Sequence, residues 1–133
     1  MKTVTPEQLS KELEKEFTAL HRSVSATAAK NVVDAAPSET GKLKGSVNLS
    51  INENDTIFGP EDPSGETTKA RINANAKQAK EKDDLFGTVG APYARAVDQG
   101  TSNTAPTGFF TNTLSNIAAI VREAKKDIEA FRN

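Results

Sequence analysis

The stretch that decides the fold is TPEQLSKELEKEFTALHRSVSATAAKNVVDA, residues 5–35. Thr5 precedes Pro6, which suits the first position of a helix because its missing N–H costs nothing there, and Gln8 completes the spacing of a capping box. Seven apolar residues then follow at spacings of 4, 4, 3, 4, 4 and 4, which keeps them on one helical face: Leu9, Leu13, Phe17, Leu20, Val24, Ala28 and Val32. The pattern predicts one helix over residues 5–35, about 45 Å long at 1.5 Å per residue.

Such a helix is long for a chain of 133 residues, which is the size of one ordinary domain. We expect a single domain over residues 1–133 and a helix that lies in part against something outside its own core. The composition points the same way: hydrophobic residues make up 35% of the chain, and Leu, Ile, Val and Phe together only about 20%, so the core is thin. The net charge of −1 argues against a disordered chain.

The centre of the chain reads as strands. Pro37 ends the first helix, and after a capped turn Val47, Leu49 and Ile51 alternate with polar residues, the period of a strand with one wet face. Residues 55–59 and 85–91 are the candidates for two further short strands. We therefore expect a small antiparallel sheet.

The chain closes with a second helix, predicted over about residues 110–131. Its apolar residues are spaced by 3, 4, 3, 4 and 3, a seam that favours packing along another helix: Leu114, Ile117, Val121, Ala124, Ile128 and Phe131. The natural partner is the N-terminal helix. The expected fold is α+β, with long N-terminal and C-terminal helices packed on the small antiparallel sheet and with a long charged loop or arm.

That arm is the excursion over residues 60–84, which is too long for an ordinary turn. An acidic block over residues 51–67 adjoins a basic block over residues 69–82. Opposite blocks of this kind suit head-to-tail contact between copies, although solvated loop faces are the commoner explanation. The candidates for such an interface are Glu61, Asp62, Lys69, Arg71, Lys77 and Lys80.

Residues 91–110 link the last strand to the last helix. Pro92 can begin a short helix in which Tyr93 and Val97 face the core, and Gly100 can end it. The polar loop that follows is a candidate for touching a neighbouring subunit, through Thr101, Ser102 and Asn103. Phe109 and Phe110 are expected to anchor the last helix.

Few groups suit catalysis. His21 is the only histidine and the chain has no cysteine, which leaves too few ligands for a zinc site. The acids over residues 53–62 lack the spacing of a calcium loop, and residues 87–90 lack the Lys-Ser/Thr of a phosphate loop. Arg95 and Asp98 can simply pair across one helical turn. We expect no enzyme activity, no cofactor and no metal.

Charge and hydropathy exclude two further classes of partner. A near-zero net charge does not give the basic face of a dedicated nucleic-acid binder. The N-terminus has no signal-peptide pattern, and no run of about 18 apolar residues occurs. The absence of cysteine fits a reducing compartment. We expect a soluble protein with no membrane contact.

Two motifs in this order resemble those of a family of tailed-bacteriophage neck or tail-completion proteins. The first is a turn between a long helix and a strand, made by Pro37, Thr40, Gly41, Leu43 and Ser46. The second precedes the last helix and consists of Tyr93, Ala94, Val97, Asp98, Gly100, Thr101, Pro106, Phe109 and Phe110. Asp98 stands where the family more often has glutamate, and Phe110 where it often has leucine.

The resemblance covers about residues 5–131. It implies a non-enzymatic virion component, assembled in the host cytoplasm, that forms a hexameric ring at the head-tail junction. Its partners would be other copies and other connector and tail proteins, with DNA only passing through the channel. The excursion over residues 60–84 would then reach an adjacent subunit. Connector, tail-completion factor and neighbour of the tail terminator all fit. A small cytoplasmic binding or assembly-chaperone module with no virion role is the main alternative, and a hydrolase or nuclease accessory factor is a second.

Overall fold

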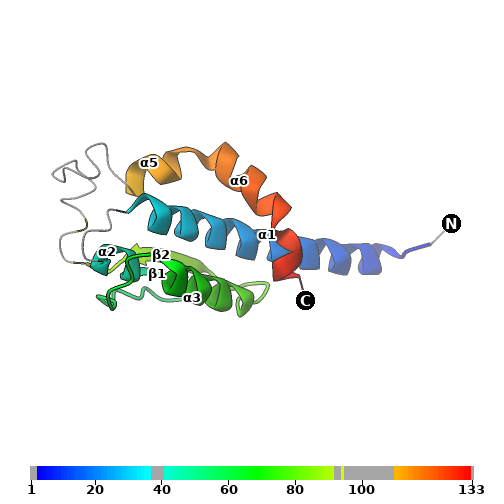
Figure 1. The fold of residues 1–133 in the computed structure, drawn as a ribbon. Coiled ribbons are helices and arrows are strands. Elements are labelled where there is room, and N and C mark those ends of the chain that lie inside the picture. Colours follow the sequence, from blue (N-terminus) through cyan, green and yellow to red (C-terminus); the bar gives the residue numbers. More distant parts are fainter. Residues whose placement is uncertain (1–2, 37–40, 92–93, 95–109, 133) are drawn as a thin grey trace.

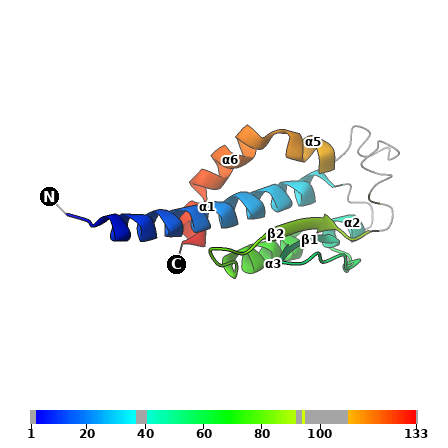
Figure 2. The ribbon, with the colours of Figure 1, turned by 180° about the vertical axis from the view of Figure 1, so that it is seen from behind.

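The computed structural model describes residues 3–36, 41–91, 94 and 110–132. Helix α1 (Pro6–Ala35) runs through the middle of the molecule, and the other elements lie along two of its sides (Figure 1). One side carries α5 (Phe110–Ser115) and α6 (Ile117–Lys126), and the 3-10 helix η2 (Ile128–Phe131) then crosses α1. The other carries α2 (Lys42–Gly45), β1 (Val47–Ile51), α3 (Glu66–Lys77) and β2 (Leu85–Val89). The view from behind shows the same layers (Figure 2), and the α+β class is confirmed.

The predicted start of α1 is confirmed. The Gln8 backbone N donates to Thr5 Oγ1 at 3.2 Å, and the Thr5 backbone N donates to Gln8 Oε1 at 2.9 Å, so the capping box is complete. At the other end, the ammonium of Lys44 donates to the carbonyl of Val33 at 2.6 Å. The same carbonyl accepts from the backbone N of Ala36 at 3.3 Å, so Lys44 adds a second donor at the end of the helix.

The face of α1 that packs into the core is not the predicted apolar stripe. Of that stripe only Val32 is buried, whereas Leu9, Leu13 and Phe17 are exposed. The buried face consists mainly of small or polar residues: Ala19, Arg22, Ser23, Ala26, Thr27, Ala29, Val32 and Val33. Small side chains suit the contacts of this face with α3 and α6, whereas Leu9, Leu13 and Phe17 lie on the turns before Ala19, where no described residue is buried.

In the described part of the chain the sheet has two strands, β1 and β2, which pair antiparallel from Val47 opposite Val89 to Ile51 opposite Leu85. Both were predicted. The third predicted strand, over residues 55–59, is wrong, because this segment has no strand geometry. Side chains hold it instead: Asn48 Nδ2 donates to the carbonyls of residues 55 and 57 at 3.1 and 3.2 Å.

The expected wet face of β1 is also corrected. Asn48 and Ser46 are both buried, since the segment after β1 folds back over this face. The hydroxyl of Ser46 donates to the carbonyl of Lys42 at 2.6 Å and accepts from the backbone N of Gly59 at 3.1 Å. Polar side chains were predicted to face water here, but they bind backbone groups of the chain itself.

The prediction of an arm-like excursion over residues 60–84 is wrong for the part that forms α3, Glu66–Lys77. α3 packs against α1 and β1, and its Ile72 and Ala76 are fully buried. Two polar side chains of α3 also donate to backbone carbonyls of β1. Arg71 Nη2 donates to the carbonyl of Val47 at 2.9 Å, and Asn75 Nδ2 donates to the carbonyl of Leu49 at 2.9 Å. α3 therefore covers one edge of the sheet and belongs to the core.

The predicted C-terminal helix over residues 110–131 is divided into α5, α6 and η2. It breaks at Asn116, whose backbone is not helical and whose side chain accepts from the backbone N of Ala119 at 3.3 Å, as an N-cap does. The break turns Ile117 out to 65% exposure, and Ile120 and Ala124 become the buried residues of α6. A second turn at Asp127 leads into η2.

Candidate assembly surface

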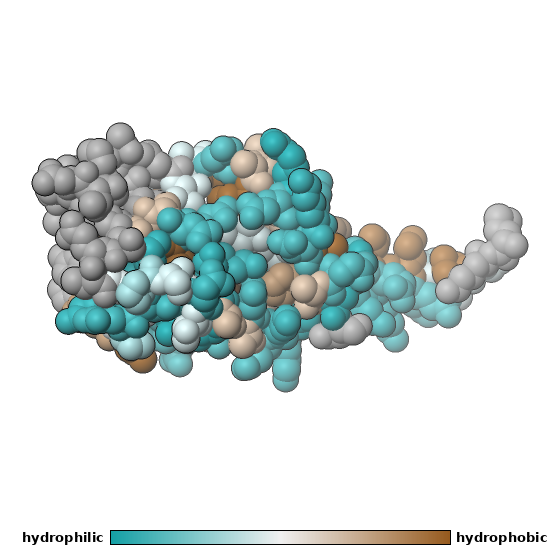
Figure 3. Space-filling model, viewed as in Figure 1, coloured by the Kyte–Doolittle hydropathy of each residue, from teal (hydrophilic) through white to brown (hydrophobic). Residues whose placement is uncertain are grey.

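A stripe of apolar side chains lies outside the core along α1. We call it the α1 stripe and define it as Leu9, Leu13, Phe17, Leu20, Val24 and Ala28. Leu9 is 51% exposed, Leu13 47% and Phe17 65%, although they are among the largest apolar side chains of the helix. Figure 3 shows hydrophobic side chains along the part of α1 that projects from the domain. Large exposed apolar patches of this kind mark interaction sites.

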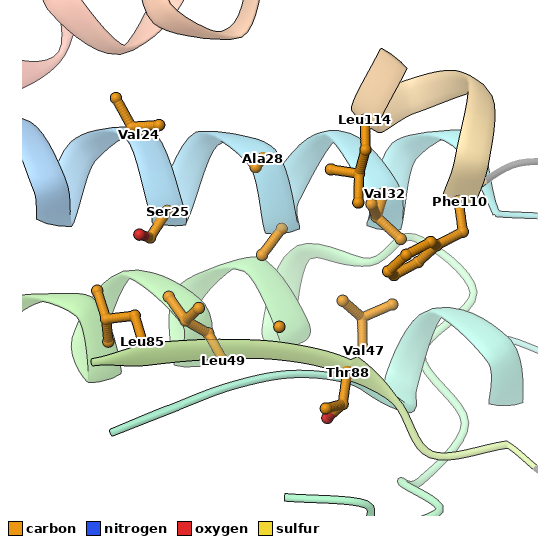
Figure 4. A pocket seen from close by; sticks show the side chains of 12 residues that line it. Val24, Ser25, Ala28, Val32, Val47, Leu49, Leu85, Thr88, Phe110 and Leu114 are labelled. Carbon is orange, nitrogen blue, oxygen red and sulfur yellow. The ribbon is translucent and has the colours of Figure 1, made fainter. Parts of the chain in front are cut away.

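The C-terminal half of the α1 stripe forms one wall of an apolar groove of about 280 Å³ (Figure 4). The groove lies between α1, the sheet and α5. Its described apolar lining consists of Val24, Ala28, Ala29, Val32, Val47, Leu49, Leu85, Phe110 and Leu114, with hydroxyl groups from Ser25 and Thr88. Val24 and Ala28 belong to both features. One apolar surface therefore runs from the exposed turns of α1 into the groove.

The groove is suited to side chains more than to a small molecule. Ligand pockets usually hold about 300–1,000 Å³ and place a few convergent polar groups around the ligand. The groove is smaller, and its described lining offers two hydroxyl groups and no charged side chain. Its chemistry is that of a contact surface.

Three of the charged interface candidates have partners within the chain. The carboxylate of Asp62 accepts from the backbone N and the hydroxyl of Thr68. Arg71 donates to β1, as described above. Lys69 Nζ lies 2.6 Å from the carboxylate of Asp34, which raises the pKa of this lysine through a side-chain hydrogen bond. These contacts link α3 to its surroundings.

The remaining candidates divide into two groups. Glu61, Lys77 and Lys80 are exposed, and their contact with a second copy stays a prediction. Thr101, Ser102 and Asn103 lie outside the described residues.

The residues of the first motif hold the turn before β1. Gly41 has a left-handed backbone with φ of 72°, and a Cβ atom there would lie 2.4 Å from the backbone N of Pro63. Leu43 is buried in the core and Ser46 anchors Gly59. Of the second motif, Phe110 is half-buried and lines the groove. Ala94 is half-buried against the core. The remaining motif residues lie outside the described part: Pro37, Thr40, Tyr93, Val97, Asp98, Gly100, Thr101, Pro106 and Phe109.

The sequence did not identify the groove. The alternation in β1 predicted that Val47 and Leu49 share a face, and the helical periodicity placed Val24 and Ala28 together. No sequence pattern indicated that α1, the sheet and α5 leave a groove between them. The one available signal was the unusual length of the apolar stripe relative to the domain.

Groups for metal or acid-base chemistry do not gather in the described residues: nowhere there do three or more His, Asp or Glu side chains lie close enough to hold a metal ion. His21 is exposed on α1. No helix within the described ranges is long and apolar enough to cross a membrane.

Comparison of the chain with models of protein families, with curated proteins and with solved structures found no match.

Proposed function

We propose that the protein is a structural subunit of a tailed-bacteriophage virion, a neck or tail-completion protein that forms a ring around the DNA channel at the head-tail junction. It would act by contact and not by catalysis, and it would join the particle in the host cytoplasm. The specific class rests on the resemblance of the two motifs.

One observation carries the proposal that the chain is an assembly subunit: α1 leaves its large apolar side chains outside its own core. Leu9, Leu13 and Phe17 are about half exposed or more. Removing apolar surface from water is favourable by about 25 cal/mol for each Å², and this gain offsets part of the cost of association when a neighbouring molecule covers these side chains.

The described motif residues add support. Gly41, Leu43 and Ser46 all occupy positions that fix the turn between the long helix and the strand. A sequence motif on such positions is a signature of the fold, and the family that it resembles uses this turn after a long helix.

A ring needs two different patches of one chain to meet, because its contacts are head-to-tail. The exposed residues of the two charged blocks can supply them: Glu61 on the acidic side, and Lys77 and Lys80 on the basic side. Reversing Lys77 and Lys80 to glutamate should weaken ring assembly, and adding Glu61→Lys should restore it. Failure of the second change to restore assembly would exclude this pair of patches.

The decisive experiment is electron microscopy of particles made without the protein. We expect DNA-filled heads and separate tails, with joining restored when the protein is supplied. Labelled antibody should mark intact particles at the neck. Normal particles in its absence, together with a protein that stays free of particles, would support the alternative of a cytoplasmic binding module.

A further inference from the structure

The apolar residues of the α1 stripe are spaced symmetrically along the helix. Without Val32, which is buried in the core, its six residues stand at spacings of 4, 4, 3, 4 and 4, and this series reads the same in both directions. A two-fold axis between Phe17 and Leu20, perpendicular to the helix, maps the stripe onto itself. Self-complementarity of one patch is the condition for a contact between two identical subunits related by a two-fold axis.

We propose that two copies of the chain pair through their α1 stripes, antiparallel, about this axis. Phe17 of one copy then lies opposite Leu20 of the other, and Leu13 lies opposite Val24. Leu9 lies opposite Ala28, so that its larger side chain meets a smaller one. The exposed half of each stripe covers the groove half of the other.

The groove provides the space for this contact. Val24 and Ala28 are only half-buried, and the 280 Å³ beside them is lined by apolar groups of the sheet and α5 (Figure 4). In the pair, Leu9 and Leu13 of the second copy would enter this space.

The shape of the molecule leaves room for the second copy. Before Ala19 no described residue of α1 is buried, and the first turns of the helix project beyond the other elements (Figure 1). An antiparallel pair centred between Phe17 and Leu20 places the two domains at opposite ends, each beside the bare turns of the other helix. A parallel pair would bring both domains to the same end.

The polar side chains beside the stripe also suit an antiparallel pair. Glu14 and His21 are exposed and stand seven residues apart, hence on the same flank of the helix. In an antiparallel pair about this axis, Glu14 of each copy comes close to His21 of the other. The lysines of this region, Lys11 and Lys15, lie on the far side of the helix and do not meet across the contact.

This pairing does not rest on the proposed ring. A ring joins two different patches, whereas the α1 stripe meets a copy of itself. The two proposals can therefore fail separately: normal particles without the protein would remove the virion role and leave the pair intact.

Sedimentation of the full chain over a wide range of concentrations tests the pair. We expect a monomer–dimer equilibrium, with a Kd raised more than about tenfold by Phe17→Asp. Because Phe17 is 65% exposed in the single copy, the variant should keep the circular dichroism and thermal midpoint of the wild type at concentrations where both are monomers. Lys15→Asp, on the far side of the same turns, is the matched control and should leave the Kd unchanged. A strictly monomeric wild type, or a dimer that Phe17→Asp leaves intact, would overturn the proposal.

Disulfide cross-linking tests the direction of the helices, since the natural chain has no cysteine. A mixture of the Leu9→Cys and Ala28→Cys variants should cross-link under mild oxidation, because these positions lie opposite one another in the antiparallel pair. A mixture of Leu9→Cys and Leu20→Cys is the control, since in the proposed pair Leu20 lies eight residues, about 12 Å along the helix, from the Ala28 that faces Leu9. Preferential cross-linking of the second mixture would exclude the antiparallel arrangement.

Discussion

The carboxylate of Asp62 accepts two hydrogen bonds from Thr68, from its backbone N at 2.7 Å and from its hydroxyl at 2.6 Å. Asp62 is only 8% exposed, and its backbone carbonyl also accepts from the backbone N of Gly65 at 3.0 Å. The side chain thereby closes the turn that leads into α3. The hydrogen bond from the Thr68 hydroxyl is the largest cause of the lowered pKa of Asp62.

This contact predicts a dependence of stability on pH. Because the pKa of Asp62 is lower in the folded chain than in the unfolded one, the ionised carboxylate stabilises the fold above about pH 4. The contribution is lost as the pH falls through the lower folded pKa. Asp62→Asn should therefore cost about 1–3 kcal/mol near pH 7, and its deficit against the wild type should shrink in acid. Urea unfolding at a series of pH values measures this.

The control for this prediction is Glu61→Gln at the exposed neighbouring residue. It should change the free energy of unfolding by no more than about 0.5 kcal/mol at both neutral and acidic pH. A deficit of Asp62→Asn that is the same at neutral and acidic pH would show that the charge of Asp62 does not stabilise the fold.

Local signals predicted local structure. The capping box at Thr5 and Gln8 fixed the start of α1 because both groups lie within one turn of the chain. The alternation over residues 47–51 predicted β1 for the same reason. Helical periodicity, in contrast, identified an apolar face of α1 but not what covers that face. The chain buries a different face of α1, the one that carries Ala19, Ser23 and Ala26, and this face has no strong hydropathy signal.

The place of α3 could not be read from the sequence. Its segment is polar, and only Ile72 is a large apolar residue among those it buries. Arg71 and Asn75 belong to the core layer through their bonds to carbonyls of β1, a role that depends on a strand more than 20 residues away. A polar segment of this kind looks like a solvated loop until the edge that it covers is known.

Truncating Ile72 tests whether α3 is part of the fold. Ile72 is fully buried between α3 and the core, so Ile72→Ala should lower the free energy of unfolding by about 2–5 kcal/mol. Lys77→Ala on the exposed face of the same helix should change it by no more than about 0.5 kcal/mol. Equal, small effects in chemical denaturation would instead fit an arm outside the core.

Arg22 of α1 donates hydrogen bonds both to the chain just after α3 and to η2, so replacing it should lower the free energy of unfolding. Its Nε donates to the carbonyl of Ala79 at 2.6 Å and its Nη1 to that of Phe131 at 3.0 Å, both in the interior. Arg22→Met keeps the apolar stem but removes both donors, and each carbonyl left without a donor should cost about 1–3 kcal/mol.

Arg22→Lys is the informative comparison, since a lysine has a single ammonium group and lacks the planar fork of donors. Its deficit should fall between those of the wild type and Arg22→Met in urea unfolding. Lys15→Met, an exposed cation of the same helix, is the control and should be nearly neutral. A stable Arg22→Met variant would mean that these carbonyls find other donors.

The two described phenylalanines at the ends of the C-terminal segment should differ in what they stabilise. Phe131 is 2% exposed at the end of η2, and Phe131→Ala should cost about 3–5 kcal/mol of unfolding free energy. Phe110 is half-buried and lines the groove, so part of its ring is already in contact with water. Phe110→Ala should therefore cost less than Phe131→Ala.

If Leu9 and Leu13 of the second copy fill that groove, Phe110→Ala should also raise the Kd of the dimer. Sedimentation measures the effect on the dimer, and chemical denaturation measures the effect on the fold. A Phe110→Ala variant as unstable as Phe131→Ala would place Phe110 in the core.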